Sequence, residues 1–137
     1  MREKLTIFEF FRTNYTKKMS ETSREKGAFA EKTARLFAEE LGYDFVQANY
    51  FGKSGEIDLI FRDRDCLVFV EVKSRWSDSF GTAEFAVNKG KLMKMKKTAQ
   101  EFLYKTKTTA KEFRFDVMAL NWSNGVPEIV HYKNVLQ

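Results

Sequence analysis

The sequence predicts one α/β domain whose helices and strands follow the order α-β-β-β-α-β. Two segments place apolar side chains three or four positions apart, as amphipathic helices do, and four shorter runs alternate or cluster apolar residues, as strands do. Two helices are available to cover a single sheet, which is the layered arrangement of an α/β domain. With 137 residues the chain is long enough for one sizeable core and too short for two.

The first half of the domain combines a helix, a strand and a hairpin. Small and apolar side chains recur at helical spacing from Gly27 onwards, and Gly42 stands where a helix commonly ends in a C-cap glycine. β-branched and aromatic residues then predict three strands joined by short polar turns. These segments are 43–50 (strand), 51–55 (turn), 56–61 and 66–73 (hairpin strands) and 62–65 (hairpin turn).

The second half contains a lysine-rich helix and further strand sequence. Eight lysines and a single acid, Glu101, lie between Lys89 and Lys111. This charge suits either a phosphate-facing surface or a solvated helix face, and the charge alone does not choose between them. The predicted segments are 74–81 (polar loop), 88–104 (helix), 113–120 (strand) and 128–132 (a last short strand).

Residues 1–26 are expected to be an N-terminal extension of the domain at 27–137. The extension suits capping of the core, self-association or loose attachment, and the sequence does not decide among them. Met19 is an alternative start of the native chain, and the intact mass of the native protein would decide this. A short amphipathic helix is predicted from apolar residues at helical spacing, which are Leu5, Phe8, Phe11 and Tyr15.

The composition excludes several classes of protein. Apolar residues make up 43% of the chain, which excludes a disordered tail. No apolar run approaches the roughly 20 residues that span a bilayer, and no cleavage site typical of a secretory signal follows the basic N-terminus. The single cysteine, Cys66, cannot form an internal disulfide and is expected to be a buried strand residue. We therefore expect a cytoplasmic protein that does not bind membranes.

The predicted hairpin carries three ionisable residues inside its apolar runs: Asp58 on the first strand, and Glu71 and Lys73 on the second. Glu71 and Lys73 are two positions apart, so they project from the same face of their strand. Pairing about the turn brings Asp58 towards them, so that two acids and a base converge at one end of the sheet. Burying such charges costs several kcal/mol unless they are paired, so the arrangement requires an explanation.

A metal site and a salt bridge both explain these charges. Two carboxylates this close repel each other unless a cation or a proton lies between them, and Mg²⁺ commonly takes one or two carboxylates with waters and phosphate oxygens. A neighbouring lysine can orient or deprotonate a water that attacks a phosphodiester. In the alternative, Lys73 is simply paired with Asp58 or Glu71 at a sheet edge. The three residues by themselves leave both explanations open.

Several segments resemble the YraN family of small bacterial proteins and, more broadly, the PD-(D/E)XK nucleases in the form seen in archaeal Holliday-junction resolvases. These segments occur in the expected order and extend over most of the chain. The resemblance implies a restriction-endonuclease-like core, with a central mixed sheet flanked by helices. The segments are GAFAEKTARLFAEELGY (27–43), QANY (47–50), GEIDLI (55–60), VFVEVKSR (68–75), the FG at 80–81, the lysine-rich helix and FRFDV (113–117).

Carried over by position, the resemblance implies a catalytic site with four members in this sequence. Asp58 and Glu71 would hold Mg²⁺ or Mn²⁺. Lys73 would be the catalytic lysine, and Glu31 would be the helical acid near the metal or the attacking water. Ile57 stands where the motif has a proline before Asp58, a departure that is common in this superfamily.

Further residues are expected to contact DNA. Arg75 can hold a phosphate through two hydrogen bonds, and Trp76 can stack on an unpaired base, although Trp76 equally suits packing of the loop. By contrast, Asp116 and His131 are expected to have structural roles. The expected nucleic-acid contacts are Lys53, Ser54, Arg75, Trp76, Lys91, Lys94 and Lys97.

The function expected from these residues and from the resemblance is that of a metal-dependent DNA endonuclease, acting on branched or recombination intermediates. The alternative is a nucleic-acid-binding or protein-binding module that keeps the fold without efficient catalysis. The intact set of Asp58, Glu71 and Lys73 favours the nuclease, because decayed relatives commonly lose one member. A homodimer would suit two-fold symmetric DNA junctions, but the sequence shows no dedicated dimer surface.

Overall fold

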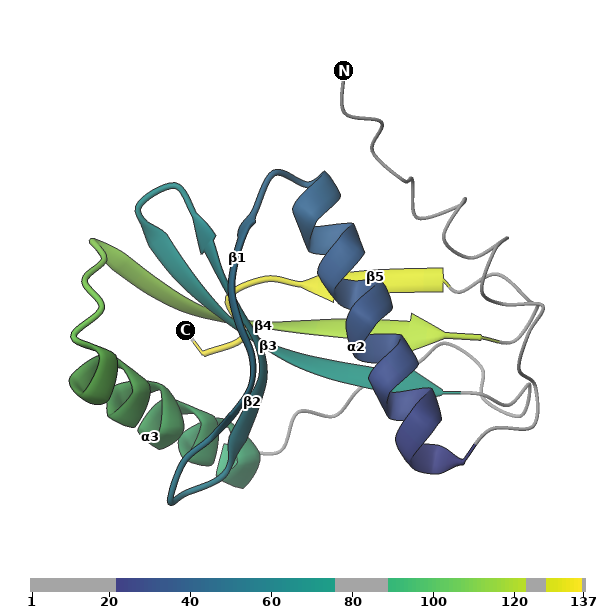
Figure 1. Ribbon diagram of the computed structural model, residues 1–137, viewed down its shortest axis with the longest axis horizontal. Coiled ribbons are helices and arrows are strands. Elements are labelled where there is room, and N and C mark those ends of the chain that lie inside the picture. The colour runs from purple at the N-terminus through teal and green to yellow at the C-terminus, as the bar shows by residue number, and fades with distance from the viewer. Residues whose placement is uncertain (1–21, 76–88, 123–127, 137) are drawn as a thin grey trace.

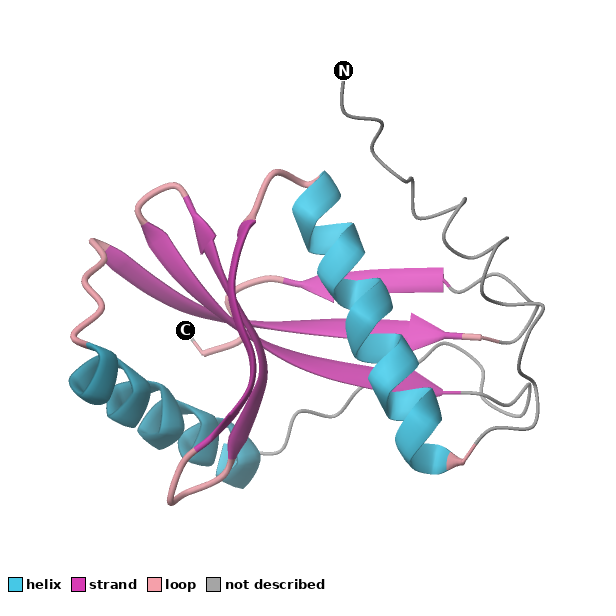
Figure 2. Ribbon diagram, viewed as in Figure 1, coloured by secondary structure: helices cyan, strands magenta, loops and turns pink. Residues whose placement is uncertain are grey.

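The structure is a computed structural model that describes residues 22–75, 89–122 and 128–136. In these ranges the chain forms a five-stranded mixed sheet with one helix packed against each face (Figure 1, Figure 2). The helix expected near residues 5–15 and the loop at 76–81 lie outside the described residues. The elements are α2 (Ser23–Glu40), β1 (Asp44–Phe51), β2 (Glu56–Asp63), β3 (Cys66–Arg75), α3 (Lys89–Thr106), β4 (Glu112–Asn121) and β5 (Glu128–Tyr132).

The predicted fold class is confirmed. The chain is α/β, and its order of elements is that of a restriction-endonuclease-like α-β-β-β-α-β core, with β5 as an additional edge strand. The predicted strand boundaries agree with the observed ones to within two residues. The hairpin turn is shorter than expected: only Arg64 and Asp65 lie outside the strands, and Arg64 takes a left-handed backbone with φ of 56°.

The strands lie in the sheet in the same order as in the sequence. Neighbouring strands are antiparallel except for β3 and β4, which are parallel. A parallel pair needs a long crossover connection, and α3 lies in that connection. The lysine-rich helix therefore packs beside the strand that carries Glu71 and Lys73.

Helix α2 begins at Ser23, four residues before the start that its apolar spacing predicts. Thr22 and Glu25 form a capping box, in which each side chain accepts the backbone N–H of the other residue. The pattern T-x-x-E is visible in the sequence, but it precedes the apolar positions and so lies outside their periodicity. At the other end Gly42 has φ of 94° and completes a Schellman-type ending, as its prediction as a C-cap requires.

Each helix covers one face of the sheet with its own apolar cluster. Three alanines of α2, at Ala30, Ala34 and Ala38, let that helix approach the sheet closely, where it meets large side chains such as Phe61. On the opposite face Phe102 of α3 packs with Ile57, Leu67 and Phe69, among others. Neither α2 nor α3 is long and apolar enough to cross a membrane.

Asp116, fully buried on β4, is the centre of a hydrogen-bond network. It accepts bonds from the Arg114 guanidinium (3.1 and 3.2 Å), from His131 Nε2 (2.8 Å) and from the backbone N–H of Asn134 (2.9 Å). Burial by itself would raise the pKa of Asp116, but the bonds from His131 and Arg114 hold it below its ordinary value. The network joins β4 to β5 and the C-terminal segment, so Asp116 and His131 have the structural roles expected of them.

We predict that Asp116→Ala destabilises the fold by about 3 kcal/mol or more, because it leaves the partly buried Arg114 and His131 side chains without their acceptor. Urea unfolding measures the difference. The matched control is Asp65→Asn, whose carboxylate is 75% exposed and should change stability by less than about 0.5 kcal/mol. Equal effects of the two substitutions would contradict the structural role.

Candidate active site

The sheet opens between β2 and β3 at Asp58. The paired register of these strands ends at Leu59 and Val70. Beyond this pair the backbone N–H of Val72 donates to Oδ2 of Asp58 at 2.7 Å, so a side chain takes the place of a ladder partner. Past this point β2 remains paired with β1, and β3 remains paired with β4. The two halves of the sheet therefore diverge and leave an opening between them.

The backbone of β1 and β2 is irregular at the same level. Ile57 packs on the α3 side of the sheet and Leu59 on the α2 side, although residues two apart in a regular strand share a face. Opposite Asp58 in the β1 register, Asn49 has a left-handed backbone with φ of 51°. Asparagine tolerates this conformation better than most residues. The break in alternation leaves Asp58 and Asn49 out of the two apolar clusters.

Asp58 and Glu71 come together at this opening, as the predicted hairpin pairing requires. Both are nearly buried, at 8% and 7% exposure. Burial first, and then the charge of Glu71, raise the pKa of Asp58 to about 7, against the opposing effect of the bond from the Val72 N–H. The site thus contains more negative charge than its own hydrogen bonds stabilise.

Two further carboxylates lie near this pair. Glu31 reaches the opening from α2, and the Asn49 side chain is hydrogen-bonded to it. Burial, followed by the charges of Glu56 and Glu71, raises the pKa of Glu31, while the bond with Asn49 acts in the opposite direction. Glu56 is the exposed first residue of β2. The helical acid implied by the resemblance is therefore close enough to act on the acids of the hairpin.

Two lysines contact the Glu71 carboxylate at the same oxygen, Oε1. Lys73 approaches from the same strand, with its Nζ 3.4 Å away, and Lys91 forms an ion pair from α3. The adjacent Lys91 ammonium, together with burial, lowers the pKa of Lys73. Burial is the largest single effect on Lys91 and acts to lower its pKa. The bonds with Glu71 and Lys73 and the charges of Glu71 and Asp58 together outweigh burial, so the pKa of Lys91 is raised. Of the two, Lys73 is the one that loses its proton more readily.

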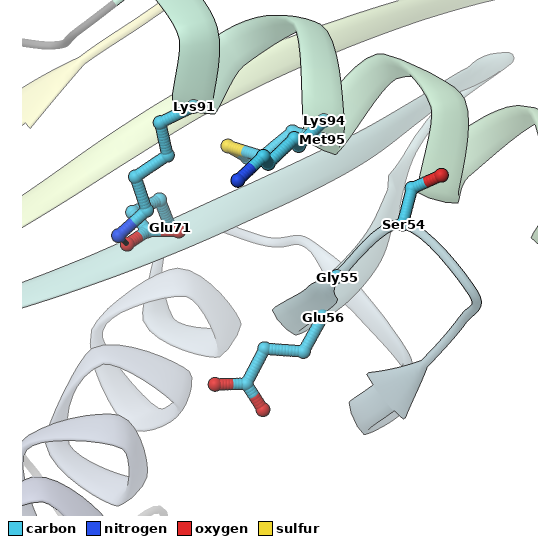
Figure 3. Close-up of a pocket in the computed structure, with 7 residues that line it drawn as sticks. All are labelled: Ser54, Gly55, Glu56, Glu71, Lys91, Lys94 and Met95. Carbon is cyan, nitrogen blue, oxygen red and sulfur yellow. Dashed lines mark ion pairs between the residues drawn. The ribbon is translucent and has the colours of Figure 1, made fainter.

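A pocket of about 190 Å³ lies between α3 and the strands that carry these acids. Figure 3 shows Lys91 reaching from α3 to Glu71, with Glu56 on β2 at the opposite side of the pocket. The helix thus contributes the cations of the lining and the strands contribute the anions. Its lining residues are Ser54, Gly55, Glu56, Glu71, Lys91, Lys94 and Met95.

The oxygen ligands at the opening fit a divalent cation with two protein carboxylates. Among the described ranges, no three Asp, Glu, His or Cys side chains meet closely enough to enclose an ion by themselves. Asp58 and Glu71 supply hard oxygen atoms, and the raised pKa of Asp58 reflects negative charge that a cation would neutralise. Mg²⁺ commonly uses only one or two carboxylates and completes its shell with waters and phosphate oxygens, so these residues fit Mg²⁺ or Mn²⁺.

Three of the residues expected to contact DNA line the pocket: Ser54, Lys91 and Lys94. Lys53 is exposed beside them in the turn between β1 and β2, where its backbone N–H donates to Glu101 of α3 at 3.2 Å. This bond fixes the turn to the lysine-rich helix. The turn and the helix therefore present their polar groups to the same space.

The other expected DNA contacts are outside the lining of this pocket. Lys97 is exposed further along α3. Arg75 is the last residue of β3, two positions beyond Lys73. Trp76 lies outside the described residues.

Asn49 and Glu56 join the site without having been assigned a role from the sequence. Asn49 belongs to QANY and Glu56 to GEIDLI, so both stand in segments that carry the family resemblance. The alternation of the first strand gives no signal for Asn49, because Gln47 and Asn49 are polar on either side of Ala48, as in an ordinary strand. Lys91, which is expected to contact a phosphate, forms an ion pair with Glu71 in the structure, a contact that was not predicted.

A family comparison covers the whole of this site. The model of the uncharacterised protein family UPF0102 matches residues 30–120, a range that contains Glu31, Asp58, Glu71 and Lys73. The chain belongs to this family. Membership in UPF0102 confirms the resemblance to the YraN family.

Individual UPF0102 proteins match this chain over most of their own length. One from Sulfurihydrogenibium sp. is 40% identical over 110 residues, which cover 80% of this chain and 92% of the relative. One from Clostridium acetobutylicum is 34% identical over 121 residues, covering 87% and 99%. One from Aliivibrio fischeri is 41% identical over 103 residues, covering 74% and 84%. The region shared with this chain therefore makes up most of each of these relatives.

We predict that Asp58→Asn stabilises the metal-free protein at neutral pH. In the unfolded wild type Asp58 ionises near pH 4, whereas in the folded state it keeps its proton until its raised pKa of about 7. Wild-type stability therefore falls as the pH rises from 4 to 7, and the loss is complete above pH 7. Asparagine avoids this loss and still offers an oxygen to the Val72 N–H.

The stability gained by Asp58→Asn should grow by about 2–4 kcal/mol between pH 4 and pH 8, as measured by urea unfolding in the presence of a chelator. Asp65→Asn serves as the exposed control and should show no such growth. A gain that does not change with pH would mean that Asp58 titrates normally in the folded protein.

Proposed function

We propose that this UPF0102 protein is a metal-dependent endonuclease that hydrolyses phosphodiester bonds in DNA. The observation that carries the proposal is the convergence of Asp58, Glu71 and Lys73 at the opening of the sheet, beside a pocket that Lys91 and Lys94 line. Two acids, a lysine of lowered pKa and a basic wall are the groups that phosphodiester hydrolysis requires. The resemblance to the PD-(D/E)XK nucleases points to the same chemistry.

In this proposal Asp58 and Glu71 hold Mg²⁺ or Mn²⁺. The ion, when bound, polarises the phosphate, offsets the developing charge and lowers the pKa of a coordinated water. The opening between β2 and β3 keeps the two carboxylates at a fixed separation, because each is on a strand that is paired on its other side. The protein thus supplies a preorganised pair of ligands.

Lys73 acts on the attacking water. An adjacent cation, which is Lys91 in this structure, and burial favour the neutral amine, whose nitrogen can accept a proton from the water that attacks the phosphorus. A divalent cation held by Glu71 would favour the neutral amine in the same way. Glu31, held by Asn49, lies on the α2 side of the same opening and orients that water through its carboxylate. The charge that develops on the phosphate is balanced by the ammonium groups of the pocket wall.

The substrate that fits this site is a nucleic acid whose backbone runs along α3 and the turn between β1 and β2. Lys94 and Lys97 contact phosphates by charge, while Ser54 and Lys53 contact them from the turn. The likeness to Holliday-junction resolvases favours branched DNA or a recombination intermediate. A homodimer would match the two-fold symmetry of such junctions.

One observation favours a second candidate, a nucleic-acid-binding module without efficient catalysis. Glu71 is already paired with two lysines, and within the described part of the chain no three acidic, histidine or cysteine side chains enclose an ion. A protein of this kind would use the same basic wall to bind DNA. Its site would neither need nor respond to a divalent cation.

We predict that Glu71→Gln and Lys73→Met each reduce DNA cleavage by at least about 100-fold, because one removes a metal ligand and the other the group that accepts a proton from water. The measurement uses linear, flapped and four-way DNA with Mg²⁺ or Mn²⁺, and with a chelator as the blank.

The matched control for cleavage is Lys96→Met, which removes one exposed lysine of α3 that is outside the pocket lining. It should retain cleavage within a few-fold of the wild type. Cleavage that survives both Glu71→Gln and Lys73→Met would come from a contaminating nuclease. Metal-independent DNA binding without any cleavage would favour the second candidate.

A further inference from the structure

Lys91 occupies the carboxylate that the proposed metal site needs. Its ammonium is ion-paired with Oε1 of Glu71, whose side chain is only 10% exposed. Lys73 contacts the same oxygen at 3.4 Å. A single carboxylate oxygen therefore has two cationic neighbours, and a divalent cation bound to it would have to displace at least one of them.

The two lysines differ in their freedom to leave. Lys73 extends from β3, within the sheet and two positions from Glu71. Lys91 extends from the third position of α3, on the other wall of the pocket. The two side chains are almost equally exposed, at 40% for Lys73 and 45% for Lys91, so the difference between them lies in the elements that carry them. A long exposed lysine side chain can change rotamer without moving the backbone. Of the two, Lys91 is the one that lines the pocket, so a change of its rotamer moves its ammonium from Glu71 into the pocket.

The open side of the pocket is where a phosphate would arrive. Lys94 lies one turn along α3 from Lys91, and Ser54 lines the same pocket from the turn between β1 and β2 (Figure 3). A phosphate among these groups would offer Lys91 a new anion at the rim in place of the buried carboxylate. A phosphodiester group stays anionic at any working pH. Lys91 would therefore replace its ion pair with Glu71 by an ion pair with the phosphate, and Glu71 would be released.

We propose that Lys91 is an internal competitor that holds Glu71 in the free protein and passes to a nucleic-acid phosphate when substrate binds, which frees Glu71 for the divalent cation. This inference rests on the proposed function. It makes nucleic-acid binding and metal binding mutually supportive, since each favours the state in which Lys91 has left Glu71. In the absence of substrate, Lys91 keeps the metal site closed.

The test is a calorimetric titration of Mn²⁺ alone into the full chain. It compares four proteins: the wild type, Lys91→Met, Lys94→Met and Glu71→Gln. Methionine keeps the length and apolar stem of lysine at an exposed helical position, and thermal unfolding checks that each variant is folded. Lys91→Met should bind Mn²⁺ about tenfold more tightly than the wild type, because the ion no longer has to displace an ammonium from Glu71. The ion pair that is removed involves a nearly buried carboxylate, so it should be stronger than an ordinary surface ion pair.

Lys94→Met is the matched control. It removes the same charge from the same pocket lining, but the ion pairs of Glu71 are with Lys73 and Lys91. The gain from Lys94→Met therefore measures the general effect of one positive charge, and it should be no more than about two- to threefold. An equal gain in both variants, or unchanged or weaker Mn²⁺ binding in Lys91→Met, would overturn the competitor role.

A second titration includes a saturating four-way DNA with phosphorothioate linkages, which resist hydrolysis. This DNA should raise the Mn²⁺ affinity of the wild type towards that of Lys91→Met and should change the affinity of Lys91→Met much less. Equal enhancement in both proteins would show that Lys91 does not couple the two ligands.

The failure of this inference is distinguishable from the failure of the proposed function. If Glu71→Gln abolishes Mn²⁺ binding while the wild type and Lys91→Met bind it equally, the metal site is retained and the competitor role is wrong. If none of the four proteins binds Mn²⁺, the metal-dependent mechanism and the inference both fail.

Discussion

The carboxylate of Asp58 stands in for a backbone partner of Val72, and most of the candidate site depends on this one hydrogen bond. With the side chain in that place, β2 and β3 stop pairing at Leu59 and Val70, and the sheet divides. Each half remains paired on its outer side, so the opening is held by regular structure around it. Without the division, Asp58 and Glu71 would belong to a continuous ladder with no space between the strands.

The two most deeply placed aspartates of the sheet are stabilised in opposite ways. Asp116 is surrounded by donors from Arg114, His131 and the Asn134 backbone, and its pKa is lowered although it is fully buried. Asp58 has a single backbone donor and three neighbouring carboxylates, and its pKa is raised. A buried acid whose donors outweigh its burial suits a structural role, whereas one that lacks compensation suits binding of an added cation.

The lysine-rich helix α3 has one buried apolar face, and only some of its exposed lysines lie at the candidate site. Leu92, Met95, Ala99 and Phe102 are buried against the sheet. Lys91 and Lys94 line the pocket, while Lys96 and Lys97 lie in solvent outside its lining. The crossover position of α3 between β3 and β4 brings this basic segment to Glu71 of β3, the strand that precedes it in the chain. The helix therefore contributes both to the core and to the charge balance of the opening.

The residues alone are enough to predict the order of the elements, the strand boundaries to within two residues, and the convergence of Asp58 with Glu71 and Lys73. Periodicity and hairpin register are local properties, and they allow these features to be derived over short distances along the chain. The capping box of α2, formed by Thr22 and Glu25, is also present in the sequence. Apolar periodicity does not detect it, because these two polar residues precede the first apolar position of the helix.

The groups from distant parts of the chain that meet at the opening can be identified only from the packed fold. Asn49 reaches Glu31 because a left-handed residue breaks the alternation of β1, and Lys91 reaches Glu71 because α3 packs over the strand that precedes it. Both contacts depend on backbone irregularity or on helix placement, and neither leaves a periodic trace in the sequence. The charges of the hairpin were therefore evident from the residues, whereas their partners were set by how the helices and the first strand pack around them.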